Sequence, residues 1–261
     1  ICEGLVGSEM CIRDSPFSKD AFGCAALLDA MASYDEKDST STKRDNINFE
    51  KSLSKDFGSL NIGVIKNIEK LGISEDVINA YETSKTVLTG LGHKLIEVDF
   101  SELSSGICSY YVIAPAECSS NLSRFDGVKY GYRSEGEKDI ANLYMNTRSD
   151  GFGDEVKKRI LIGTHVLSAG FYDAYYLQAQ KVRRMIKVKF EDFFKHVDLI
   201  FMPTTLDQAF EKNRKSDDPN RMYKEDLLTI PANLAGLPAI SFPNGFKTVS
   251  YTHLTLPTSY A

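Results

Sequence analysis

A strand–helix–strand pattern between residues 60 and 100 constrains the fold of this chain most strongly. Residues 60–65 (LNIGVI) are apolar with little alternation, which is typical of a strand buried on both faces. Ser74 then begins a helix that ends at Gly92, and residues 93–100 (HKLIEVDF) form a second strand. Two parallel strands joined by a helix need a sheet that helices cover, so the pattern predicts an α/β fold.

The rest of the chain adds further helices and strands. Residues 198–202 (DLIFM) form a third buried strand, and ligands in open α/β sheets tend to bind beyond such strand ends. Pro115 should kink or split the helix in which it lies, because it lacks a backbone donor. A short helix, a Gly-Leu-Pro turn and a strand follow over 225–243. Helices are further predicted over 20–33, 105–122, 153–170 and about 172–196, the last being the longest.

Composition excludes several classes of function. The net charge is −5, so the chain offers no positive field for a nucleic-acid backbone, and another chain is expected to hold any nucleic acid. No apolar run reaches the roughly 18 residues of a membrane span. The five cysteines include no C-x-x-C pair and the four histidines show no ligand spacing, which indicates a reducing compartment and no metal site.

The residues alone reveal no catalytic machinery. There is no G-x-S-x-G elbow, P-loop or G-x-G-x-x-G, and the S-x-x-K of residues 52–55 lies in a polar connector without its usual partner motifs. Arg159 and Asp226 are charged residues in apolar surroundings. They either pair with each other structurally or together hold a zwitterion, whose carboxylate and ammonium they would bind.

Three segments, in consistent order, resemble the amidase signature family. They are residues 116–133 (AECSSNLSRFDGVKYGYR), 151–183 (GFGDEVKKRILIGTHVLSAGFYDAYYLQAQKVR) and 230–241 (IPANLAGLPAIS). The first two resemble the branch formed by the A subunits of tRNA-dependent amidotransferases. The third occurs across the family. The resemblance runs from about Pro16 to Thr248.

The resemblance implies a mixed-sheet α/β amidase fold, with helices on both faces of the sheet and only its C-terminal part present. It implies a protein that hydrolyses glutamine and supplies ammonia for converting Glu-tRNA(Gln) to Gln-tRNA(Gln), or Asp-tRNA(Asn) to Asn-tRNA(Asn). The implied partners are the B and C subunits, of which one uses ATP and magnesium and holds the charged tRNA. No cofactor is implied for this chain, and its location would be the cytoplasm or an organelle matrix.

The resemblance also implies which residues bind glutamine. Arg159 would hold the α-carboxylate, Asp226 the α-ammonium, and Tyr110 would line the pocket, with Tyr111 as the alternative one position away. The nucleophilic serine, second serine and lysine of the family lie ahead of the segment that matches PFSKD. No catalytic residue therefore carries over, and this chain alone is expected to be inactive.

Both ends depart from the family pattern. Residues 1–15 and 249–261 are expected to be adaptor or assembly sequence, which leaves 16–248 as the C-terminal part of one amidase domain. Two other functions remain open on the sequence. One is a stand-alone amidase that acts on small amides, and the other is an inactive, truncated binding domain.

Overall fold

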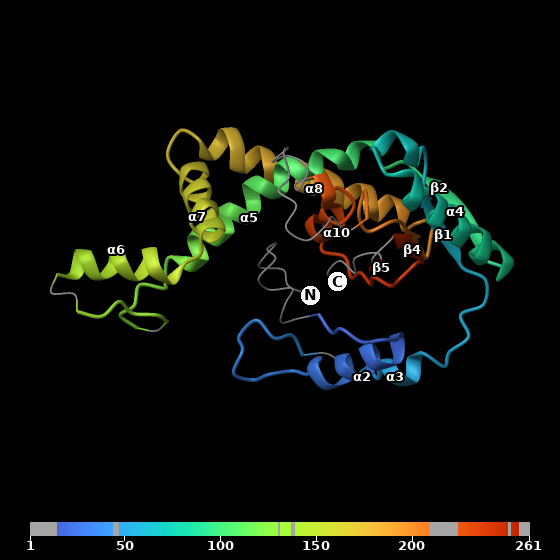
Figure 1. Ribbon diagram of the computed structural model, residues 1–261, viewed down its shortest axis with the longest axis horizontal. Coiled ribbons are helices and arrows are strands. Elements are labelled where there is room, and N and C mark those ends of the chain that lie inside the picture. The colour runs from blue at the N-terminus through green and yellow to red at the C-terminus, as the bar shows by residue number, and fades with distance from the viewer. Residues whose placement is uncertain are drawn as a thin grey trace.

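The computed structural model describes residues 15–43, 47–129, 131–136, 139–208, 224–249 and 252–255, which form helices and short strands (Figure 1). The helices are α2 (Ala21–Met31), α3 (Phe49–Ser52), α4 (Glu75–Gly90), α5 (Gly106–Leu122), α6 (Ile140–Gly151), α7 (Asp154–Val166), α8 (Leu177–Phe193) and α10 (Ile230–Ala235). The strands are β1 (Asn61–Ile65), β2 (Lys94–Val98), β3 (Leu199–Phe201), β4 (Phe246–Val249) and β5 (Thr252–Thr255). The shorter turns are η1 (Ile68–Leu71), η2 (Ser101–Ser105) and η3 (Tyr172–Tyr176).

β1 is the central strand of a three-stranded parallel sheet with the order β2-β1-β3. Ile62 lies in register with Leu95 of β2 and with Leu199 of β3. Helix α4 connects β1 to β2, so the predicted strand–helix–strand unit is confirmed, as is the third strand. Antiparallel pairing among the described strands is confined to β4 and β5, which form a separate sheet.

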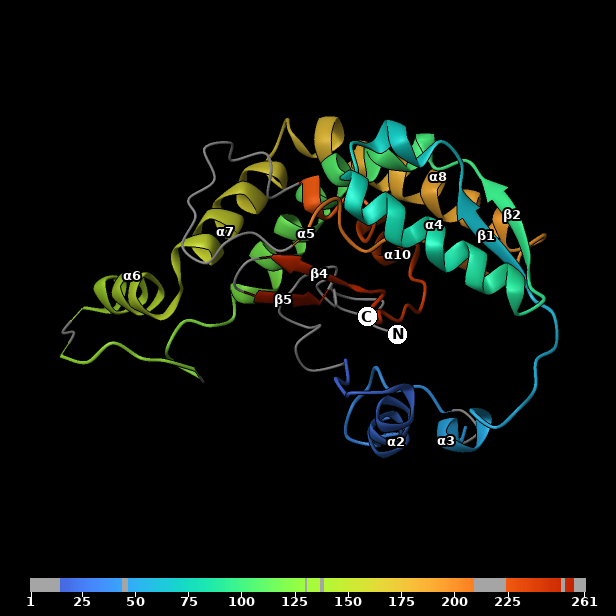
Figure 2. The same ribbon diagram turned by 45° about the vertical axis from the view of Figure 1, so that its right-hand side comes forward.

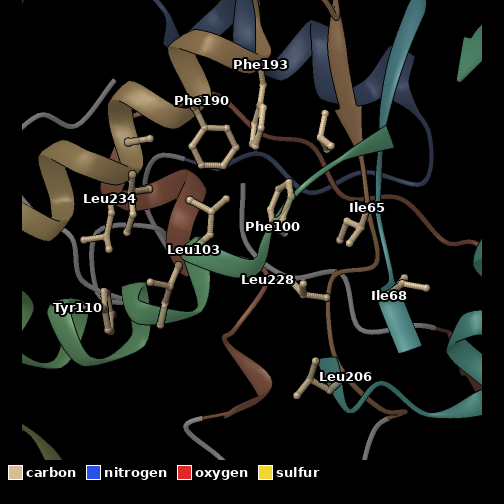
Figure 3. Packing of buried hydrophobic residues seen from close by; sticks show 14 of the residues in the cluster. Ile65, Ile68, Phe100, Leu103, Tyr110, Phe190, Phe193, Leu206, Leu228 and Leu234 are labelled. Carbon is tan, nitrogen blue, oxygen red and sulfur yellow. The ribbon is translucent and has the colours of Figure 1, made fainter. Parts of the chain in front are cut away.

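The core lies where helices cover this sheet. Helices α4 and α8 lie on opposite sides of β1 (Figure 2), which confirms the α/β class. The ring of Phe100, after β2, meets Phe190 edge-on at 5.9 Å and stacks on Phe193 at 5.9 Å (Figure 3). Burying each such ring contributes about 1.5–3 kcal/mol, so α8 is held to the sheet mainly by apolar burial.

A buried tyrosine ties two strand ends together inside this core. The Ile65 amide donates to the Tyr81 hydroxyl oxygen at 3.0 Å, and that hydroxyl donates to the Phe201 carbonyl at 3.0 Å. Burial raises the pKa of Tyr81 despite the bond from Ile65, so the hydroxyl stays protonated. Its one donor and one of its acceptor positions are thereby used within the core.

The predicted longest helix begins with a π turn. In η3 the Leu177 amide donates to the carbonyl of Tyr172, five residues earlier, and α8 continues from there. Such a turn accommodates one residue more than an α turn. The apolar stripe of α8 faces the core, with Ile186 and Phe190 buried.

Two local predictions involve prolines. Of the kink or split predicted at Pro115, the split does not occur, because α5 continues through Pro115, where residues 113–116 are buried and their packing offsets the missing hydrogen bond. The strand predicted after the Gly-Leu-Pro turn is wrong, since residues 237–245 form no strand. Pro238 and Pro243 cannot donate to a ladder. Ile240 is 67% exposed, so it does not supply the buried face that a strand requires.

The segment before β1 packs mainly on itself. The Asp29 carboxylate accepts the amides of Phe49 at 2.7 Å and Glu50 at 3.1 Å, which fixes the start of α3 against α2. Figures 1 and 2 both show this helix pair apart from the sheet. Two of the large apolar side chains in this segment, Phe17 and Phe22, are more than half exposed.

The predicted terminal segments lie largely outside the described residues. Residues 1–14, 250, 251 and 256–261 are not described, so the assignment of 1–15 and 249–261 stays a prediction. Among the helices that are described, none has the length and apolar character to cross a membrane.

Candidate functional site

The predicted site residues come from three separate elements. Tyr110 lies in the first half of α5 and Arg159 near the middle of α7, while Asp226 lies in the turn before α10. The Asp226 carbonyl accepts the Ile230 amide at 3.0 Å, which joins this turn to α10. The structure brings these residues together, because Arg159 interacts electrostatically with both Tyr110 and Asp226.

A close crossing of α5 and α7 explains this arrangement. A Cβ atom at Gly163 would lie 1.9 Å from the carbonyl oxygen of Pro115, so only glycine permits the observed approach. Ser119 and Thr164 hydrogen-bond through their hydroxyl groups at 2.8 Å beside the contact. Tyr111 and Arg159 each lie four residues, about one helical turn, before the crossing. Their long side chains can therefore reach the same space.

Asp226 is held by a tyrosine that the sequence offered only as an alternative. The Tyr111 hydroxyl donates to the Asp226 carboxylate at 3.2 Å. Burial, followed by the charge of Asp226, raises the pKa of Tyr111, so the phenol remains a donor at neutral pH. Tyr110 is 8% exposed, and its ring meets Tyr111 edge-on at 5.1 Å. Both tyrosines therefore belong to the site, Tyr111 beside Asp226 and Tyr110 beside Arg159.

Arg159 is held by a second acidic residue. Its Nε donates to Glu155 Oε1 at 3.2 Å, and its side chain is 22% exposed. Burial opposes the charge, but Glu155 and Tyr110 outweigh it and raise the pKa of Arg159. The guanidinium is therefore a permanent cation in a partly enclosed position. Glu155 is the residue that sequence reasoning missed, although its spacing four residues before Arg159 was a visible signal.

Asp226 supplies the carboxylate of the site. Partial burial raises the pKa of its carboxyl group, whereas the hydrogen bond from Tyr111 and the charge of Arg159 lower it. Arg159 and Asp226, which are both described, form no ion pair with each other; Arg159 pairs with Glu155. The direct ion pair that the sequence left open does not form between these two residues, and each has another partner, Glu155 for Arg159 and Tyr111 for Asp226. A cation and an anion that share a space without contact suit a zwitterionic ligand.

A separate hollow lies in the loop before α6. Its volume is about 270 Å³, and it is lined by Arg133, Ser134, Glu135, Gly136 and Leu143. None of the predicted site residues contributes to it. The hollow is therefore separate from the group of residues around Arg159.

Comparison with known proteins gives consistent matches. The sequence pattern of the Amidase family matches residues 3–257. The A subunit of the glutamyl-tRNA(Gln) amidotransferase of Hahella chejuensis is 48% identical over 90% of this chain and 49% of its own length. The protein of the same name from Cellvibrio japonicus is 51% identical over 87% of this chain and 47% of its own length. The chain thus spans about half the length of these relatives.

Solved structures share the fold. The A subunit of the glutamyl-tRNA(Gln) amidotransferase of Thermotoga maritima is 33% identical, with a TM-score of 0.67 over 92% of this chain and 47% of that chain. A 6-aminohexanoate cyclic dimer hydrolase has a TM-score of 0.65 over 92% of this chain and 49% of that chain, at 18% identity, and so speaks for the fold alone. Since the family pattern covers nearly all 261 residues and the α/β fold agrees, the chain belongs to the amidase family.

Proposed function

We propose that this chain is part of the A subunit of a glutamyl-tRNA(Gln) amidotransferase. That protein hydrolyses glutamine and supplies ammonia for converting Glu-tRNA(Gln) to Gln-tRNA(Gln), and in a dual-specificity complex Asp-tRNA(Asn) to Asn-tRNA(Asn). The observation that carries the proposal is the convergence of Arg159 with the Tyr111–Asp226 pair. The likeness to relatives of that name supports it.

In this proposal the site holds the amino-acid end of glutamine. Arg159 binds the α-carboxylate through its guanidinium donors, and Asp226 accepts the α-ammonium. Tyr110 lines the pocket beside Arg159, with Tyr111 beside Asp226. Fixing both charged groups orients the carboxamide toward the attacking serine and restricts the freedom of the substrate before reaction.

The hydrolytic step belongs to the full-length protein. The proposed serine nucleophile, second serine and lysine lie ahead of Pro16 in family order, so the 261-residue chain alone is expected to release no ammonia above background. The B and C subunits are the proposed partners in the cytoplasm or an organelle matrix. One of them uses ATP and magnesium and holds the charged tRNA, in keeping with the negative charge of this chain.

The site assignment is tested in the full-length protein within its complex. Arg159→Ala removes a charge-assisted contact worth about 1.5–3 kcal/mol, so the KM for glutamine should rise roughly tenfold to hundredfold. Lys157→Ala is the matched control, because Lys157 pairs with Asp154 at 3.2 Å instead of facing the site. An unchanged KM in the Arg159 variant would refute the assignment.

Purification separates the proposed function from a stand-alone amidase. The tagged full-length protein should co-purify with the B and C subunits, and its glutamine hydrolysis should depend on them. A protein that purifies without the B and C subunits and is fully active on small amides would favour the stand-alone enzyme. Turnover of glutamine by the 261-residue chain would contradict the expected lack of a nucleophile.

A further inference from the structure

We infer that Glu155 is a positioning residue for glutamine binding, which it serves by fixing the Arg159 guanidinium before the substrate arrives. The inference rests on the proposed function, because it assumes that Arg159 binds the α-carboxylate. Its structural basis is the bond from Arg159 Nε to Glu155 Oε1 at 3.2 Å.

The location of this bond indicates its role. Glu155 is 56% exposed in its side chain and Arg159 only 22%, so the pair joins the exposed surface of α7 to the partly enclosed guanidinium of Arg159. Exposed pairs with this spacing on a helix contribute little to stability. The bond at Nε instead determines the plane of the guanidinium, since Nε lies closest to the side-chain stem. The remaining four N–H donors can then serve Tyr110 and a ligand carboxylate.

The benefit to binding is preorganisation. A free arginine side chain populates many rotamers, and ordering it on binding reduces affinity. Arg159 already has one side-chain anchor at Glu155 and an electrostatic neighbour in Tyr110. The opposite possibility is that Glu155 competes with the substrate carboxylate for Arg159. Preorganisation predicts that removing Glu155 raises the KM for glutamine, whereas competition predicts that it lowers the KM.

The test uses the full-length protein in its complex, with glutamine as the titrant. Glu155→Ala should raise the KM for glutamine by about fivefold with little change in kcat. Glu155→Gln, which keeps an acceptor for Nε, should restore part of that loss. Asp154→Asn is the matched control, because Asp154 lies in the same first turn but its fully exposed carboxylate pairs with Lys157. It should leave the KM unchanged.

A double variant shows whether Glu155 acts through Arg159. Adding Glu155→Ala to Arg159→Ala should raise the KM no further, because the residue being positioned is gone. A KM in the double variant that is a further fivefold higher than in Arg159→Ala would overturn the inference. An unchanged or lowered KM in Glu155→Ala alone would also overturn it. If instead the proposed function were wrong, Arg159→Ala itself would leave the KM for glutamine unchanged. That result distinguishes failure of the proposed function from failure of this inference.

Discussion

Tyr81 in the sheet core and Tyr111 in the candidate site differ in the groups to which their hydroxyls hydrogen-bond. Burial raises the pKa of both, so each remains a neutral donor. Tyr81 bonds to the backbone of two strands, Ile65 and Phe201. Tyr111 bonds to the carboxylate of Asp226. The buried phenol of Tyr81 thus joins structural elements, while the partly buried phenol of Tyr111 hydrogen-bonds the carboxylate that binds the ligand in the proposed function.

The largest expected effect concerns the crossing that creates the site. Gly163→Ala forces a Cβ atom against the Pro115 carbonyl and should reduce the free energy of unfolding by about 3 kcal/mol. It should also raise the KM for glutamine, because α7 carries Arg159. Gly90→Ala is the control, since a Cβ atom at Gly90 meets open space and should slightly stabilise α4. Chemical denaturation of the full-length protein measures the free energy of unfolding of both variants. Equal stabilities of the Gly163→Ala and Gly90→Ala variants would contradict the close contact at Gly163.

The next effect isolates the core tyrosine. Tyr81→Phe leaves the buried Ile65 amide without its acceptor and should cost about 2 kcal/mol of stability. The KM for glutamine should stay constant because Tyr81 lies in the sheet core. Denaturation and steady-state kinetics on one preparation check both statements. A higher KM with unchanged stability would reverse the contrast between the two tyrosines.

The smallest effect is a shift of pH dependence. The hydrogen bond from Tyr111 lowers the pKa of Asp226, so Tyr111→Phe should raise that pKa. In the proposed function Asp226 binds the α-ammonium of glutamine in its ionised form, so the acidic limb of kcat/KM should move to higher pH. A bond of about 1 kcal/mol corresponds to about 0.7 pH unit. Tyr81→Phe is the matched control and should not move the limb; a shift to lower pH in Tyr111→Phe would exclude the proposed role.

Local sequence patterns predicted the elements but not every contact. The run at 60–65 predicted a buried strand because its apolar residues fill both faces. The structure confirms this strand as β1. The strand expected after Gly236 failed because apolar residues there are flanked by prolines and left exposed. The interstrand bridge of Tyr81 could not be predicted, since it depends on how α4 lies against β1 and β3.

The same limit applies to the site. Arg159 and Asp226 stood out because charges in apolar segments need a partner or a ligand. Neighbouring residues on a helix point about 100° apart, so choosing between Tyr110 and Tyr111 required the rotation of α5. The structure assigns them to different neighbours. The role of Gly163 depends on the tertiary contact with Pro115, which no local pattern contains.

The π turn η3 has a consequence for how this chain tolerates changes of length. It accommodates one residue beyond an ordinary helical turn, and α8 follows it directly. Deleting a residue within α8 would rotate Phe190 or its neighbours by about 100° away from Phe100. Deleting one within η3 would convert a wide turn into a normal one and leave the rest of α8 in phase. Single-residue length variation among relatives should therefore concentrate at residues 172–176.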